Sequence, residues 1–236
     1  MKRLLLTVLV VVVGCGEKQI TPAQLEANDK GVAEMGRFEY AEAEATFKAL
    51  IEEAPGWHDA RVNHAIAVLN RQDDGDEHLA LELLAAVLVE NPDHLRALYT
   101  SGIIHLYLGD AAKAAVMFER VTQGDPGDAY AAYFHGQSKL QLEDHEAAAQ
   151  AMLRAVELDP YLRSAYWAGS QALRRLDRLD DSTALLEAYQ RFEPNPAARM
   201  AGFSYKKMGP KAEVVSTSPI LVAQPERPAG PLFAPP

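Results

Sequence analysis

Five prolines recur along the chain at nearly constant spacing, and this repeat constrains the fold more than any other feature of the sequence. They are Pro55, Pro92, Pro126, Pro160 and Pro194; the last three intervals are each 34 residues and the first is 37. Small residues and large apolar residues recur in phase with these prolines. The small ones are Gly31, Ala65, Gly102, Gly136 and Ser170, then Ala43, Ala80, Ala114, Ala148 and Ser182; the large ones are Phe47, Leu84, Phe118, Met152 and Leu186. A period of this length indicates an array of repeated supersecondary units.

The residue types in the repeat indicate pairs of helices. Two helices that cross closely need small residues where they face each other. A large apolar residue four positions after a small one lies on the same helix face. Proline ends the second helix because it has no N–H and constrains the residue before it. We therefore expect about five helix pairs, followed by one more helix at about Ala197 to Met208 that covers the last pair.

A helix pair that recurs every 34 residues resembles the tetratricopeptide repeat, and the resemblance covers about Leu25 to Met208. It implies an all-α, right-handed superhelical solenoid of about five helix pairs plus a C-terminal capping helix. The second repeat carries roughly three extra residues between its helices, within Asn70 to Glu77. The family's tryptophan near the repeat start is absent; Ala27, Arg61, Leu98, Ala132 and Tyr166 stand at that position.

A solenoid of this kind has a concave face, lined by the first helix of each pair, and this face holds the candidate site. Tyr99, Tyr133 and Trp167 fill one concave position at intervals of 34 residues. The other candidate groove residues are Arg96, Ile103, Tyr107, Tyr130, Gln137, Gln171 and Arg174. Rigid aromatic surface and bidentate donors are typical of binding hot spots, so we expect a protein or peptide partner here. Alternatively, the aromatic residues pack between repeats or against the chain's own C-terminal segment.

The N-terminus has the pattern of an export signal. Lys2 and Arg3 precede an apolar run from Leu4 to Val13, which is shorter than the ~20 residues that a membrane span needs. The sequence from Val12 to Cys15 resembles the lipobox of bacterial lipoproteins, which implies that Cys15 is acylated and anchors the chain to a membrane. Gly16, rather than aspartate, follows the cysteine, which implies the outer membrane, facing the periplasm. The alternative is a plain secretory signal with an incidental cysteine.

These patterns divide the chain into four parts. The last part has seven prolines in 28 residues and no helical period, so we expect it to be disordered. The parts are a lipoprotein signal peptide at 1–14, a tether at 15–24, the repeat array with its capping helix at 25–208, and the Pro-rich tail at 209–236.

Composition and motifs exclude several classes of function. The formal net charge of −10 repels phosphate backbones, so nucleic acid is not an expected partner and a basic protein patch is a better one. A single cysteine permits no internal disulfide and no zinc site made of cysteine pairs. The sequence has no metalloprotease, phosphate-loop or nucleophile-elbow motif. We expect neither an enzyme nor a cofactor or metal site.

These inferences together predict a membrane-anchored lipoprotein that binds or scaffolds other proteins in the bacterial cell envelope. Two alternatives stay open. The chain could be a spacer lipoprotein that acts through its Pro-rich tail, or the repeat module of a β-propeller system of the VCBS/UnbV type.

Overall fold

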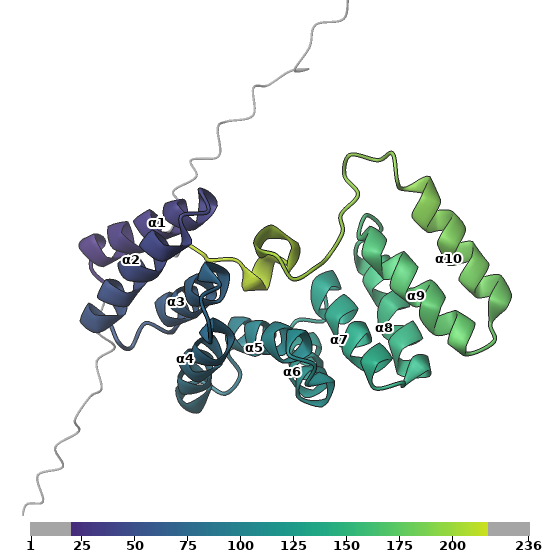
Figure 1. Cartoon of the computed structure of the whole chain (residues 1–236), viewed down its shortest axis with the longest axis horizontal. Helices are drawn as coiled ribbons and strands as arrows, with labels where there is room; N and C mark the ends of the chain where they lie inside the picture. The colour runs from purple at the N-terminus through teal and green to yellow at the C-terminus, as the bar shows by residue number, and fades with distance from the viewer. Residues whose placement is uncertain (1–19, 217–236) are drawn as a thin grey trace, which may run out of the picture.

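The computed structural model describes residues 20–216, and within them ten α-helices form five antiparallel pairs (Figure 1). The pairs are α1 (Pro22–Gly36) with α2 (Tyr40–Glu53), α3 (His58–Arg71) with α4 (Asp76–Glu90), α5 (Leu95–Tyr107) with α6 (Ala111–Gly124), α7 (Ala129–Gln141) with α8 (His145–Leu158), and α9 (Arg163–Arg175) with α10 (Leu179–Arg191). The all-helical solenoid predicted from the repeat is confirmed. No described helix is long and apolar enough to cross a membrane. The predicted signal peptide, the start of the tether and residues 217–236 of the tail lie outside the described residues.

Local sequence signals set the helix boundaries. Each second helix ends two or three residues before a repeat proline, as the spacing predicts. Aspartates begin several helices: the carboxylate of Asp128 accepts from the Ala131 N–H at 2.9 Å, and Asp110 caps α6 in the same way. Thr21 and Gln24 form a capping box at the start of α1. The array therefore begins at Pro22, within the predicted tether.

Four of the five first helices, α1, α5, α7 and α9, pack closely on their partners through a glycine, and α3 has Ala65 at the repeat position. A Cβ atom at Gly31 would lie 2.7 Å from the Phe47 ring, and one at Gly102 would lie 2.9 Å from the Phe118 ring. The small and large residues of the repeat therefore meet within a helix pair, 16 positions apart in sequence. In the last pair both positions contact α10: a Cβ atom at Gly169 would lie 2.9 Å from Leu185, and the Ser170 carbonyl accepts from the Ser182 hydroxyl at 2.9 Å.

The first helices of successive pairs contact one another, so α1, α3, α5, α7 and α9 line the inner face of the solenoid. The second helices form the outer layer (Figure 1). The extra residues of the second repeat form a turn that Arg71 closes through an ion pair with Asp76 at 2.6 Å. This turn places Gln72 and Gly75 at positive φ.

The predicted capping helix at about Ala197–Met208 is wrong. After α10 the chain turns back along the inner face in a mostly extended conformation, with two 3-10 turns, η1 (Tyr205–Lys207) and η2 (Pro210–Ala212). Figure 1 shows this part of the chain running from α10 past α7 and α5 to α1. Contacts with distant helices replace the hydrogen bonds of a helix, so local helix propensity does not decide its conformation. Residues 209–216 also belong to this docked part of the chain rather than to the predicted disordered tail.

Candidate functional site

The inner face of the solenoid is occupied by the chain itself. We call residues 199–216 the C-terminal segment, and the part of the inner face that it covers, on α1, α3, α5 and α7, the groove. The segment is held at its two ends and at its centre by groups of the first helices and of the turns that precede them. It therefore shows which kinds of contact this surface makes with an extended polypeptide.

The segment begins with main-chain pairing at the start of α9. The N–H of Arg199 donates to the Tyr161 carbonyl at 2.7 Å, and the N–H of Arg163 donates to the Arg199 carbonyl at 2.8 Å. The Arg199 guanidinium forms an ion pair with Asp159. One residue further into α9, the hydroxyl of Ser164 accepts from the Ala201 N–H at 3.1 Å. These contacts fix the direction in which the chain leaves the α9–α10 pair.

Tyr99, at the centre of the groove, binds the middle of the segment. Its hydroxyl donates to the Met208 carbonyl, and its ring packs edge-on against Phe118 and Phe134 at centroid distances of 5.5 and 6.2 Å. The side chain is fully buried, and burial raises the pKa of its hydroxyl well above the ordinary value. Tyr99 is therefore a neutral donor to the segment at any physiological pH.

An acidic pair binds the only charged side chain between Gly209 and Ala212. The ammonium of Lys211 lies 2.5 Å from the Asp125 carboxylate and 2.7 Å from that of Asp128. Burial opposes the charge on Lys211, but the hydrogen bonds to the two carboxylates outweigh it and raise the pKa of the lysine. In return, Lys211 lowers the pKa of Asp125. This part of the groove selects a cation.

Two buried asparagines bind the end of the segment through its main chain. The side-chain carbonyl of Asn63 accepts from the Val215 N–H at 3.1 Å, and its amide donates to the Val215 carbonyl at 2.9 Å. Asn28 donates to the same carbonyl at 3.0 Å. Both asparagine side chains lie in helix interiors, where this residue type is unfavourable, and both are fully buried. Their location is explained by the peptide group that they bind.

Arg96 connects this asparagine pair to the rest of the array. Its guanidinium donates to the Glu213 carbonyl at 2.8 Å, to the Asn63 side-chain carbonyl at 2.7 Å and to Asp59 at 2.7 Å. Burial lowers the pKa of Arg96, and the Asp59 carboxylate offsets part of that effect. The buried positive charge is thus compensated by Asp59 and by carbonyl oxygens.

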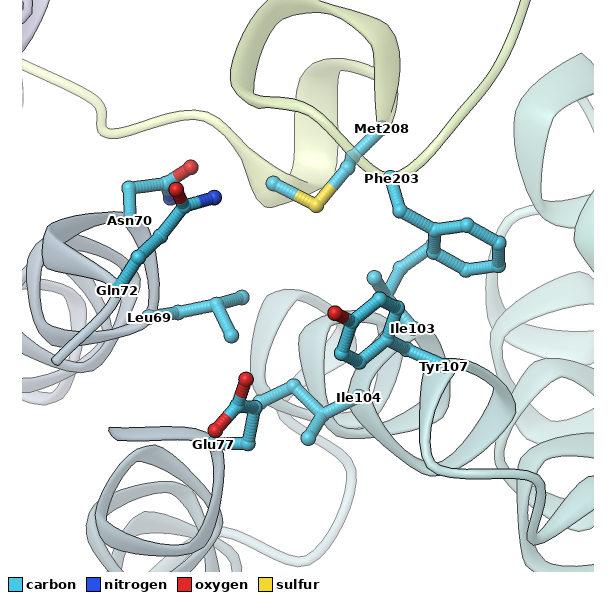
Figure 2. Close-up of a pocket in the computed structure, with 9 residues that line it drawn as sticks. All are labelled: Leu69, Asn70, Gln72, Glu77, Ile103, Ile104, Tyr107, Phe203 and Met208. Atoms are coloured by element: carbon cyan, nitrogen blue, oxygen red, sulfur yellow. The ribbon is translucent and has the colours of Figure 1, made fainter. Parts of the chain in front are cut away.

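A pocket of about 270 Å³ opens beside the segment, between α3, α5 and the turn before α4. Figure 2 shows the Met208 side chain extending from the segment toward the side of Asn70 and Gln72, and the Phe203 ring on the side of Tyr107. The Phe203 ring packs against Tyr107 at 5.7 Å and is 44% exposed. The remaining lining residues are Leu69, Asn70, Gln72, Glu77, Ile103 and Ile104. The lining of the pocket thus combines apolar side chains with the polar side chains of Asn70, Gln72 and Glu77.

The segment leaves one part of the inner face uncovered, which we call the uncovered end: Trp167, Gln171 and Arg174 of α9. Trp167 is 50% exposed, and its ring lies 5.7 Å from that of Tyr189. The residues at the equivalent positions, Tyr99 and Tyr133, are buried. Gln171 also lines a hollow of about 340 Å³ with Leu140, Glu143, His145 and Arg175.

The candidate groove residues thus fall into three groups. The first group contacts the segment or lines the pocket beside it: Arg96, Tyr99, Ile103, Tyr107 and Tyr130. The second group is the bonded pair Tyr133 and Gln137, in which the amide donates to the phenol oxygen at 3.1 Å. Trp167, Gln171 and Arg174 form the third group, the uncovered end. The alternative that the aromatic residues pack against the chain's own C-terminal segment is confirmed for Tyr99.

The sequence interpretation missed the polar residues that hold the segment. They are Asn28, Asn63, Asp125, Asp128, Asp159 and Ser164. Asn28 and Asn63 carried a usable signal, because an asparagine at an inner position of a helix competes with the helical backbone unless it has another partner. The aspartates carried none, because each lies in a turn or at a helix start, where this residue type is common.

Comparison with known proteins agrees with this geometry. The family model of the tetratricopeptide repeat matches residues 67–129 and 99–163. Among solved structures, MamA 41-end from Desulfovibrio magneticus RS-1 is similar at a TM-score of 0.67 and 22% identity, over 75% of this chain and 99% of that one. The MamA RS-1 ArsTM double mutant has the same TM-score and identity, over 75% of this chain and 97% of that one. MamA MSR-1 is similar at a TM-score of 0.61 and 15% identity, over 74% of this chain and 98% of that one. No curated protein matches the sequence.

The central part of the chain, residues 67–163, therefore carries tetratricopeptide repeats, and the ten described helices together have the fold of a tetratricopeptide-repeat solenoid. Solenoids of this kind present an extended concave surface that can bind a partner. In this chain the C-terminal segment lies against that surface, through contacts such as those of Tyr99 and Asn63.

Proposed function

We propose that this protein is a lipid-anchored scaffold of the bacterial cell envelope, which holds a protein or peptide partner on the inner face of its solenoid. In this proposal acylated Cys15 attaches the chain to the membrane, with the outer membrane, facing the periplasm, as its location. The array acts through binding and carries out no reaction. The formal net charge of −10 disfavours nucleic acid as a partner, because it repels the phosphate backbone.

The anchor is supported by the N-terminal sequence. Lys2 and Arg3, the apolar run and Cys15 have the order and lengths of a lipoprotein signal, and Cys15 is the only cysteine of the chain. Metabolic labelling with an alkyne-bearing fatty acid tests this part of the proposal. Labelled protein in the membrane fraction is the expected result, and Cys15→Ser should abolish it. Equal labelling of the two proteins would exclude acylation at this residue.

One observation carries the binding proposal: Trp167 is half exposed at a position whose equivalents in the neighbouring repeats are buried. An exposed indole costs solvation free energy, and surface tryptophans and arginines are enriched at the centres of protein interfaces. Gln171 and Arg174 follow Trp167 one and two turns later on the same helix, so they supply donors beside the apolar ring. The uncovered end therefore has the composition of a binding hot spot.

Crosslinking capture from envelope membranes tests this surface. The comparison is between the wild type, Trp167→Ala and a matched control, Val116→Ala, whose side chain is 59% exposed on the outer helix α6. A protein that wild type and Val116→Ala capture, and Trp167→Ala does not, supports the proposal. If wild type and both variants capture the same proteins, the uncovered end does not bind the partner and the proposal is wrong at this surface.

A further inference from the structure

We propose that the groove is a binding site for a separate extended peptide with the pattern apolar residue–Gly–x–cation, in which x is any residue, and that the C-terminal segment occupies this site as an internal ligand which such a peptide displaces. This inference rests on the proposed function, because it identifies the class of partner that the inner face takes. The segment carries the pattern as Met208-Gly209-Pro210-Lys211. Four features of the contact support the assignment.

The groove binds the segment largely through its main chain. Tyr99 donates to the Met208 carbonyl, Arg96 to the Glu213 carbonyl, and Asn63 binds both the N–H and the carbonyl of Val215. Main-chain groups are the same in every peptide, so these contacts provide affinity without requiring this particular sequence. A second polypeptide in the same extended conformation can make all of them.

Gly209 supplies a strict requirement. Its φ is +95°, a conformation that side chains rarely adopt. A Cβ atom there would lie 2.6 Å from the hydroxyl of Tyr99 and 2.8 Å from the ring of Tyr130. Both the backbone conformation and the available space therefore select glycine at this position.

The positions on either side of the glycine are also selective. Met208 is 2% exposed and lines the pocket with Ile103 and Leu69, so an apolar side chain fits there. Lys211 is bound by two carboxylates, so a cation is required three residues later. The net charge of the chain also favours a basic peptide over an acidic one.

The segment can leave without breaking a helix. It is joined to α10 only through residues 192–198, and its contacts use side chains of the first helices and main-chain groups at the start of α9. Its release would hydrate Asn28, Asn63 and Arg96 but leave the hydrogen bonds within the ten helices in place. A competing peptide therefore has to replace these polar contacts, those of Tyr99 and Lys211, and the apolar contacts of Tyr205, Met208, Ala212 and Val214, but no hydrogen bond within the ten helices. The attached segment lowers the apparent affinity of that peptide by the fraction of molecules with a free groove.

The test measures fluorescence anisotropy of a fluorescein-labelled synthetic peptide of residues 203–216 with purified full-length protein. Four proteins are compared: wild type, Gly209→Ala, Lys211→Glu and the control Gly202→Ala. Gly202 lies in the same segment, but a Cβ there would meet nothing closer than 3.9 Å. Gly209→Ala and Lys211→Glu weaken the internal ligand and leave the groove unchanged. We expect both to bind the peptide at least about tenfold tighter than wild type and Gly202→Ala do.

Controls separate this inference from the proposed function. A peptide with alanine in place of the glycine should bind the Gly209→Ala protein at least about tenfold more weakly than the natural peptide. Equal affinity for all four proteins, no binding to any of them, or equal affinity for the two peptides overturns the inference. Circular dichroism confirms that the variants keep their helices. If the peptide test fails while capture through Trp167 succeeds, only the inference is wrong; if capture fails as well, the proposed function is wrong too.

Discussion

Asn63 makes more hydrogen bonds to the C-terminal segment than any other described side chain, and its replacement gives the sharpest test of how the segment is held. The side chain makes four hydrogen bonds in all. Two are to the segment: the amide donates to the Val215 carbonyl at 2.9 Å, and the side-chain carbonyl accepts from the Val215 N–H at 3.1 Å. The other two are within the array: the amide donates to Asn28 at 3.0 Å, and the carbonyl accepts from the Arg96 guanidinium at 2.7 Å. Neutral hydrogen bonds contribute about 1 kcal/mol each and one to a charged group about 1.5–3 kcal/mol. Arg96 and the Val215 carbonyl keep other partners, so we expect Asn63→Ala to lower the free energy of unfolding by roughly 3 kcal/mol.

Asn70 provides a matched control on the same helix. It is also buried, but its side chain makes one hydrogen bond, to the Ile66 carbonyl at 2.8 Å. Asn70→Ala removes the same atoms and should cost about 1 kcal/mol. The difference of about 2 kcal/mol corresponds to a urea midpoint roughly 1 M lower for Asn63→Ala, at a slope of about 2 kcal/mol per M. The assay is urea unfolding followed by circular dichroism. If the two midpoints coincide within about 0.2 M, the asparagine does not hold the segment as described.

Three further predictions follow from the geometry. Gly102→Ala places a methyl group 2.9 Å from the Phe118 ring and should destabilise the array by about 1–3 kcal/mol in thermal melts; an unchanged melting temperature contradicts the packing. Burial lowers the pKa of His64 below its value of about 6.5 in the unfolded chain, so the stability that the neutral histidine contributes is present above about pH 6.5 and is lost as the pH falls below it. His64→Leu should therefore reduce the loss of stability between about pH 7.5 and 5.0, and an unchanged loss refutes this. Lys211→Ala should raise the pKa of Asp125 in an NMR titration, and a constant pKa would show that the ion pair is absent.

Most of the fold could be predicted from the sequence because its determinants are local and periodic. Each repeat proline lies just after a second helix, and glycines such as Gly102 lie where a large side chain crosses. These signals recur in phase, so an error in one repeat does not displace the others. The longer turn in the second repeat was visible as an interval of 37 residues in place of 34.

The course of the chain after α10 could not be predicted in the same way. Residues 197–208 contain helix-forming residues, and local propensity favoured a capping helix there. Partners 40 to 187 residues away determine the conformation instead, through Asp159, Tyr99 and Asn28. No local pattern in the sequence indicates such partners.

The candidate site was predicted in outline only. The interval of 34 residues placed Tyr99, Tyr133 and Trp167 at equivalent positions, and this equivalence made all three candidates for partner binding. The structure separates them, because Tyr99 binds the chain's own Met208 carbonyl while Trp167 stays half exposed. Periodicity identifies equivalent positions but contains no information about a non-repeating segment that covers some of them.

The docking of the C-terminal segment in the groove is the central claim, and amide hydrogen exchange at Val215 tests it most directly. The Val215 N–H donates to the Asn63 side chain and belongs to no helix, so only docking of the segment protects it. Exchange measured by NMR on the intact protein should be at least about 100-fold slower than in a free peptide of the same sequence, and Asn63→Ala should remove the protection. Exchange at the rate of the free peptide in the wild-type protein would show that the groove is empty and contradict the account.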